Sequence, residues 1–296
     1  MAAFIMAGPV QAIAFTTLCA LLGLFLLPLE LLSSAAIALV TLRLGGAKGL
    51  QIAVPSGLLF SGIVLLLLGR LSPALGLVFL QWLPVLLLAL VLQQSASWRQ
   101  VMVTTFGVSL LGIVLFHIVT GDPQAFWKPL LQPALELPMI KQQFQNLDAD
   151  SLLESSSAIA TGMFAALLTL GTLISLMLGR HWRAMLYNPG GFGQELRELR
   201  LPRMLGLGMV GLIGLVMFSQ LPLLIDLIIV GLVMFMFQGL ALIHELHHRM
   251  GLHIGWLIGF YTALVLLNIH LIILLAAFGI IDSIADFRNA LRNKVK

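Results

Sequence analysis

Nine long apolar runs, separated by short stretches of charged and turn-forming residues, constrain this chain more than any other feature. They cover residues 8–27, 31–42, 50–69, 74–93, 101–120, 155–179, 204–220, 222–243 and 254–281. A soluble domain carries about 25% charged residues, whereas this chain has only 9% and cannot cover a surface that faces water. Because backbone groups in hydrocarbon must be satisfied internally, and the runs do not alternate like barrel strands, we expect helices. The sequence therefore predicts an all-α polytopic membrane bundle of about eight to ten transmembrane helices.

The second run, 31–42, is short and would span about 18 Å as a helix. It follows Pro28 and Glu30, so we expect a tilted or partial helix there.

No stretch is polar enough to form a soluble domain, so residues 1–296 are expected to form a single membrane domain. The net charge of +4 comes from basic residues at the ends of apolar runs, which indicate topology and do not predict nucleic-acid binding. Cys19 is the only cysteine, and no cofactor is expected.

The distribution of lysine and arginine predicts the orientation of the chain. Segment 180–203 carries five arginines, whereas 121–154 carries two lysines against five acidic residues. Loops rich in Lys and Arg stay in the cytoplasm. We therefore expect 180–203 to be a cytoplasmic basic loop, 121–154 to be a periplasmic loop at the membrane interface, and the N-terminus to be cytoplasmic. This arrangement is typical of a protein of a bacterial inner membrane.

The last apolar run, 254–281, leaves two topologies open. As one helix it would be about 42 Å long, against a hydrocarbon core of about 30 Å. A break near 268–270 would form a short hairpin instead. The hairpin would place the basic residues from Arg288 onward in the cytoplasm, which is the topology we favour.

Residues 244–248 match the pattern H-E-x-x-H, in which two histidines one helical turn apart bind zinc and the glutamate activates a water molecule. His244 and His248 would be the metal ligands, and Glu245 the catalytic base, of an intramembrane protease. The sequence offers three aspartates as a third ligand and selects none: Asp226, Asp282 and Asp286. A polar segment at the membrane interface, without a metal, is the alternative that we favour.

Four residues are candidates for a small-molecule site: Glu30, His117, Trp127 and Gln238. Ionisable residues within membrane segments are functional candidates by default, although His117 and Asp226 also suit positions near the membrane surface. Asp282 suits a solvated helix end. Trp127 would place its ring at headgroup depth, beside a pocket beneath 121–154. Gln238 lies in an apolar run and needs a partner inside the protein, so a structural contact between helices competes with ligand binding.

Small residues recur in two of the predicted helices. Ala12, Thr16 and Ala20 follow one another at a spacing of four, and four glycines lie between Gly206 and Gly214. Such residues let helices approach closely, either within the fold or against another membrane protein.

Short motifs along most of the chain carry a family resemblance. They are Leu39-Val40-Thr41-Leu42-Arg43, Asn188-Pro189-Gly190-Gly191-Phe192 with Arg200-Leu201-Pro202, Gln238-Gly239-Leu240-Ala241 before His244, and Gly279-x-x-Asp282 before Asp286-Phe287-Arg288. Together they resemble the YybS-like family of uncharacterised bacterial membrane proteins, which is similar to the S components of energy-coupling-factor vitamin transporters. The resemblance implies an S-component-like helical core with a short second helix. It also implies that Ala12, Thr16 and Ala20 contact a transmembrane coupling protein.

Three functions remain open on these grounds. The first is a small-molecule binding or transport component, the second a non-catalytic scaffold or accessory subunit of a membrane complex, and the third a zinc intramembrane protease. The chain has no P-loop motif, so active transport would need a partner or an ion gradient. We favour binding or transport over an enzyme, with the lipid bilayer and a membrane protein as the expected partners.

Overall fold

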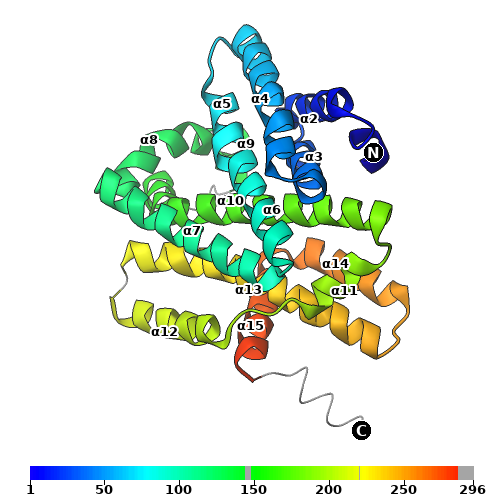
Figure 1. Cartoon of the computed structure of the whole chain (residues 1–296). Helices are drawn as coiled ribbons and strands as arrows, with labels where there is room; N and C mark the ends of the chain where they lie inside the picture. Colours follow the sequence, from blue (N-terminus) through cyan, green and yellow to red (C-terminus); the bar gives the residue numbers. More distant parts are fainter. Residues whose placement is uncertain (144–147, 220, 286–296) are drawn as a thin grey trace. The chain divides into compact units, whose positions relative to one another are not determined.

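The computed structural model describes residues 1–143, 148–219 and 221–285, and within these residues the chain forms helices and no strands (Figure 1). The predicted all-α membrane fold is confirmed. Six helices are long and apolar enough to cross a membrane, or up to eight if each of two bent helix pairs is one span. Contacts divide the chain into a first unit, residues 1–104 with 168–199, and a second unit, residues 105–167 with 200–296.

The first unit is built around α3. Its helices are α1 (Ala2–Ile5), α2 (Pro9–Gly23), α3 (Leu27–Leu44), α4 (Gly46–Leu68), α5 (Ser72–Gly76), the π-helical η1 (Leu77–Trp82), α6 (Leu83–Ser95), the start of α7 (Trp98–Thr120), the end of α10 (Ala149–Tyr187) and α11 (Gly191–Glu198). α3 packs against α2, α4 and α6. Residues 33–42 of α3 are all buried, and the small side chains at positions 33–36, 38 and 41 let neighbouring helices approach.

α3 extends the predicted run 31–42 at both ends and has 18 residues. Pro28 lies in the first turn of α3. The N–H groups of a first turn have no partner within the helix, so the missing N–H of proline costs nothing there. Glu30 therefore lies in the first turn of α3. α2, with 15 residues, is the shorter of the two helices.

Ala12, Thr16 and Ala20 on α2 are buried inside the first unit, so the prediction that they contact a membrane partner needs correction. Ala12 belongs to an apolar cluster with residues of α3, and Ala20 to a second cluster that includes Phe60. The physical reason is that α2 packs against both α3 and α4. The small side chains are used for contact between helices of the same chain.

The second unit contains the remaining helices. They are the rest of α7, α8 (Pro123–Leu135), α9 (Pro138–Gln143), the first part of α10, α12 (Arg203–Ser219), α13 (Pro222–Arg249), α14 (Ile254–Leu267) and α15 (Ile269–Ala285). α15 packs against α12, α13 and α14, and it crosses α13 closely (Figure 1). A Cβ added to Gly239 would lie 2.8 Å from the carbonyl carbon of Leu275, and one added to Gly279 would lie 2.9 Å from that of Phe235. Only glycine fits at either position.

Segment 121–154, predicted as a loop, contains two short helices and the start of α10. Asp122 caps α8, because its Oδ1 accepts hydrogen bonds from the N–H groups of Gln124 and Ala125 at 3.0 and 3.2 Å. No residue of α8 is buried. The 39 residues of α10 would be about 58 Å long, well beyond a hydrocarbon core of about 30 Å.

The last apolar segment is broken at Asn268, which decides between the two alternatives for its shape. The direction of the chain bends by 119° there, between α14 and α15. Asn268 has a φ of +40° and a ψ of −111°, so the backbone leaves the helical conformation there. The segment is therefore not one straight helix; the basic residues from Arg288 onward lie outside the described residues.

The basic segment 180–203 begins within α10, which continues to Tyr187. A turn follows, in which Gly190 has a φ of +85°. α11 then runs from Gly191 to Glu198 and ends before Pro202. Segment 180–203, predicted as a loop, thus contains the end of α10, a turn and the short helix α11.

Candidate functional site

His117 of α7 and Asp226 of α13 form a buried ionisable pair in the second unit. The Nε2 atom of His117 lies 2.7 Å from the Oδ2 atom of Asp226, and the two side chains are 16% and 1% exposed. α13 begins at Pro222, so Asp226 lies one turn inside the helix. Neighbouring helices cover the side chain of Asp226 almost completely, so its carboxyl group does not face solvent. His117 lies in the last turn of α7, an end where the helix dipole favours a cation.

The other oxygen of Asp226 is bound to the backbone of α10. Its Oδ1 atom accepts a hydrogen bond of 2.7 Å from the N–H group of Gly162. Gly162 permits this approach, since an added Cβ would lie 2.7 Å from the Cα atom of Asp226. The carboxyl group thus has one partner from α7 and one from α10, which satisfies both of its oxygens. Gly162 was not identified from the sequence; the only signal is two small residues, 161 and 162, within a long apolar helix.

Trp127 connects α8 to the same turn of α10. Its Nε1 atom donates a hydrogen bond of 2.9 Å to the Oγ1 atom of Thr161, the neighbour of Gly162. The indole ring lies 6.1 Å from the ring of Phe116, the neighbour of His117, and 5.5 Å from the ring of Phe164. Two of the four candidate residues, His117 and Trp127, are therefore brought into one cluster. We call residues 117, 127, 161, 162 and 226 the acid–base cluster.

The acid–base cluster has the chemistry of a proton-binding site. A carboxyl group and an imidazole at hydrogen-bond distance can pass a proton from one to the other. In an apolar bundle every change in protonation alters the charge of a region where charge is costly. Histidine is the side chain whose ordinary titration lies closest to neutrality. The arrangement can therefore hold a proton between a side chain of α7 and a side chain of α13.

Glu30 belongs to the first unit, whereas His117 and Trp127 belong to the second. Its carbonyl oxygen accepts a hydrogen bond of 2.7 Å from the Oγ atom of Ser33. A Cβ added to Gly23 of α2 would lie 2.9 Å from the Cβ atom of Glu30, so α2 and the start of α3 touch there. Glu30 is half-buried at the junction of these two helices.

Gln238 and Asp282 form a second buried polar contact in the second unit. The Nε2 atom of Gln238 donates to the Oδ2 atom of Asp282 at 2.9 Å, and its Oε1 atom accepts from the N–H group of Leu201 at 3.0 Å. Gln238 thus joins α13 to α15 and to the segment before α12, which is the structural role weighed from the sequence. Asp282 is fully buried. The expectation of a solvated helix end is wrong for Asp282, because α13 packs over that face of α15.

Replacing Gln238 with leucine should lower the free energy of unfolding by about 1–3 kcal/mol, because the N–H of Leu201 and the carboxyl of Asp282 each lose a partner in a buried place. Denaturant unfolding in mixed micelles measures the effect. Gln100→Leu, which changes an exposed glutamine, is the matched control and should stay within about 0.5 kcal/mol of the wild type. Equal stabilities for the two variants would contradict the role given to Gln238.

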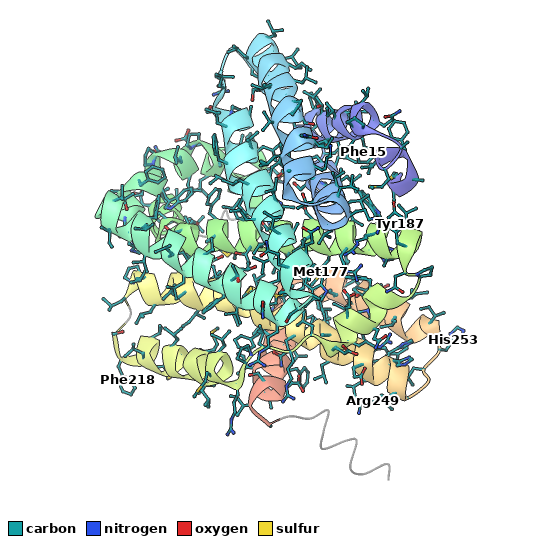
Figure 2. The ribbon with its side chains drawn as sticks, viewed as in Figure 1. Phe15, Met177, Tyr187, Phe218, Arg249 and His253 are labelled. Atoms are coloured by element: carbon teal, nitrogen blue, oxygen red, sulfur yellow. The ribbon has the colours of Figure 1, made fainter. Side chains whose placement is uncertain are left out.

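The H-E-x-x-H segment lies at the end of α13, beside the turn that carries Arg249 and His253 in Figure 2. The Nδ1 atom of His244 lies 2.9 Å from the carbonyl oxygen of Leu240, and its Nε2 atom lies 3.3 Å from the hydroxyl of Tyr261. Both ring nitrogens of His244 therefore have protein partners, with Nδ1 as donor and Nε2 as acceptor in the neutral ring.

The remaining residues of the zinc pattern have different surroundings. Glu245 is paired with Arg249, and His248 is exposed. Across the described ranges, no three His, Cys, Asp or Glu side chains are grouped so that they could hold a metal ion. Of the aspartates considered as a third ligand, Asp226 and Asp282 bind other partners, and Asp286 lies outside the described residues.

An apolar cavity of about 220 Å³ lies between α7, α12 and α13 in the second unit. Phe106, Leu110, Leu201, Leu205, Gly208, Met209, Leu212, Met234 and Phe235 line it. The lining contains no ionisable side chain, so the cavity suits an apolar group. Met234 lies eight residues after Asp226 on α13, about 12 Å along the helix.

Neither a family model, nor a curated protein, nor a solved structure matches this chain.

Proposed function

We propose that this chain is a small-molecule binding or transport component of a bacterial inner membrane, and that the acid–base cluster binds its coupling proton. The observation that carries the proposal is the pair formed by His117 and Asp226, which is buried among helices long and apolar enough to cross a membrane. An ionisable residue in this setting is costly, and such residues typically mark ion or proton pathways. A purely structural contact could be built from apolar or neutral polar side chains.

Two further features support the same proposal. The 220 Å³ cavity shares α7 and α13 with the acid–base cluster, so a ligand there would touch the helices that hold His117 and Asp226. Its lining favours an apolar ligand or an apolar part of one.

We also propose membership of the YybS-like family, and with it similarity to S components, on the motifs quoted above. The proposed orientation, with the N-terminus in the cytoplasm, rests on the positions of lysine and arginine.

The proton-binding role can be measured without knowing the ligand. Infrared difference spectra of the protein in lipid, recorded across a pH titration, should contain a carbonyl band where a carboxyl group takes up a proton. The band should be missing in Asp226→Asn and shifted in His117→Gln. Asp150→Asn, which changes an exposed carboxyl at the start of α10, should retain it. A wild-type spectrum identical to that of Asp226→Asn would contradict the proposal.

A scaffold is the second candidate, and the open glycines of α12 favour it. A Cβ added to Gly208, Gly211 or Gly214 would meet nothing within 4 Å, whereas Gly206 is packed against Ser283 of α15. Gly208 lines the apolar cavity, which leaves Gly211 and Gly214 open to a close helix from another protein. A stoichiometric partner that is retained in mild detergent, and is lost from Gly211→Leu, would support the scaffold.

A further inference from the structure

Three arginines gather at one end of the first unit. Arg180 and Arg183 lie on one face of α10 with Tyr187, because residues three and four apart share a face of a helix. Arg43 comes from the last turn of α3, and its guanidinium carbon lies 4.1 Å from the centre of the Tyr187 ring. Figure 2 labels Tyr187 at the end of α10. The cluster therefore combines the ends of two helices that are long and apolar enough to cross a membrane.

One carboxylate faces this cluster, and it is already engaged. Glu195 of α11 binds Arg180 through both of its oxygens, with the Nε atom of Arg180 at 3.0 Å from Oε2. The Nε1 atom of Trp98 donates to the same oxygen at 3.1 Å. Glu195 therefore has little capacity left for another cation.

Arg43 and Arg183 are left with an excess of positive charge. Arg183 is attracted by Glu195 but repelled by both Arg43 and Arg180. Within the described part of the chain, no carboxylate is bonded to Arg43 or Arg183. Three guanidinium groups against one carboxylate leave two positive charges uncompensated, and Arg183 is only partly exposed to solvent. An anion placed between them would relieve the repulsion.

Aromatic side chains lie beside the cluster at the ends of helices. Trp98 begins α7, its indole ring lies 6.2 Å from Phe192, and Tyr187 ends α10. Trp and Tyr are enriched where the hydrocarbon meets the lipid headgroups. The anion that reaches this level of a membrane in quantity is the phosphate of an anionic phospholipid, and basic pockets between helices bind such headgroups.

We propose that Arg43 and Arg183 form a binding site for the phosphate group of an anionic phospholipid, in the leaflet next to segment 180–203. The planar guanidinium donates two parallel hydrogen bonds to phosphate oxygens, which suits this headgroup better than a point charge. Arg180, with Glu195, holds the end of α10 in place beside the site. The site is independent of any transport by the second unit.

Native mass spectrometry of the detergent-purified chain tests the site, with phosphatidylglycerol and phosphatidylcholine added in equal amounts. We expect phosphatidylglycerol to be retained at least about tenfold more strongly than phosphatidylcholine, and about fivefold less strongly after either Arg43→Gln or Arg183→Gln. Arg70→Gln, which removes an exposed arginine at the opposite end of α4, is the matched control and should leave retention unchanged. Equal retention of the two lipids, or an equal loss in Arg70→Gln, would overturn the site.

Two further measurements separate the remaining explanations. Inorganic phosphate that displaces phosphatidylglycerol at similar concentration would identify a site for the free anion and overturn the lipid. If a glutamine variant does not fold, the wild type still decides the question: its preference for phosphatidylglycerol must weaken as salt is raised. A preference that is insensitive to salt contradicts a site made by two arginines. Arg183→Lys should keep part of the preference for phosphatidylglycerol. The positive charge remains in this variant, but lysine cannot donate the two parallel hydrogen bonds of a guanidinium group.

Discussion

Gly279→Ala is expected to lower the free energy of unfolding by about 3 kcal/mol, because the added methyl group would meet the backbone of α13. The new Cβ would lie 2.9 Å from the carbonyl carbon of Phe235 and 3.1 Å from the backbone nitrogen of Gly239. Backbone atoms within a helix cannot rotate aside as a flexible side chain does, so α13 and α15 must move apart. Denaturant unfolding in mixed micelles gives the free energy, and the apparent melting temperature in detergent gives an independent reading.

Gly211→Ala on α12 is the matched control, because nothing lies within 4 Å of its added Cβ. Alanine is favoured over glycine inside a helix by up to about 1 kcal/mol, so this variant should be neutral or slightly more stable. The contrast between the two variants isolates the crossing of α13 and α15 from any general effect of changing a helical glycine. A Gly279→Ala protein as stable as Gly211→Ala would show that the two helices do not touch as described.

Asp226→Ala is expected to cost about 3 kcal/mol of unfolding free energy, because it removes one member of a buried pair and leaves the other without a partner. His117 loses the acceptor that lies 2.7 Å away, and the N–H group of Gly162 loses its bond to Oδ1. Asp226→Asn keeps an oxygen for Gly162 and should cost less than the alanine variant. The same unfolding measurement applies to both variants.

Asp150→Ala is the control for this second prediction, since Asp150 is exposed at the start of α10. It should change the free energy of unfolding by no more than about 0.5 kcal/mol. If Asp226→Ala unfolds like Asp150→Ala, the carboxyl group contributes nothing to holding α7, α10 and α13 together. The infrared band proposed for Asp226 would then also need another origin.

The fold class could be predicted from the sequence because each apolar run must become a helix in hydrocarbon. The boundaries were harder to predict, since polar residues near a run look like its end. Glu30 stands in the first turn of α3, and the Ser-rich residues 151–157 continue α10 outward by several turns. The break at Asn268 was foreseen as one of two alternatives, because the run 254–281 was too long for one span.

The acid–base cluster could be predicted only in part. His117 and Trp127 stood out as polar or aromatic residues near the ends of runs, but nothing in the sequence joins His117 to a residue 109 positions further on. Asp226 and Asp282 both lie near the end of an apolar run, and that position does not reveal that their side chains are buried. Whether a carboxyl group is buried depends on which neighbouring helix covers it. The packing of the helices determines this, and the position of a residue along the chain does not reveal it. Ala12, Thr16 and Ala20 illustrate the same point, since their spacing predicts a helix contact but not which helix makes it.

The length of α10 has a mechanical consequence. The part of α10 in the second unit, residues 149–167, begins with turns around Asp150 that are exposed and polar, and it can act as a lever. Gly162 lies 12 residues from Asp150, about 18 Å inward along the axis. A load applied to the outer turns would tilt the N–H group of Gly162 relative to Asp226. A force on the first turns of α10 would therefore change the strength of the hydrogen bond between Gly162 and Asp226.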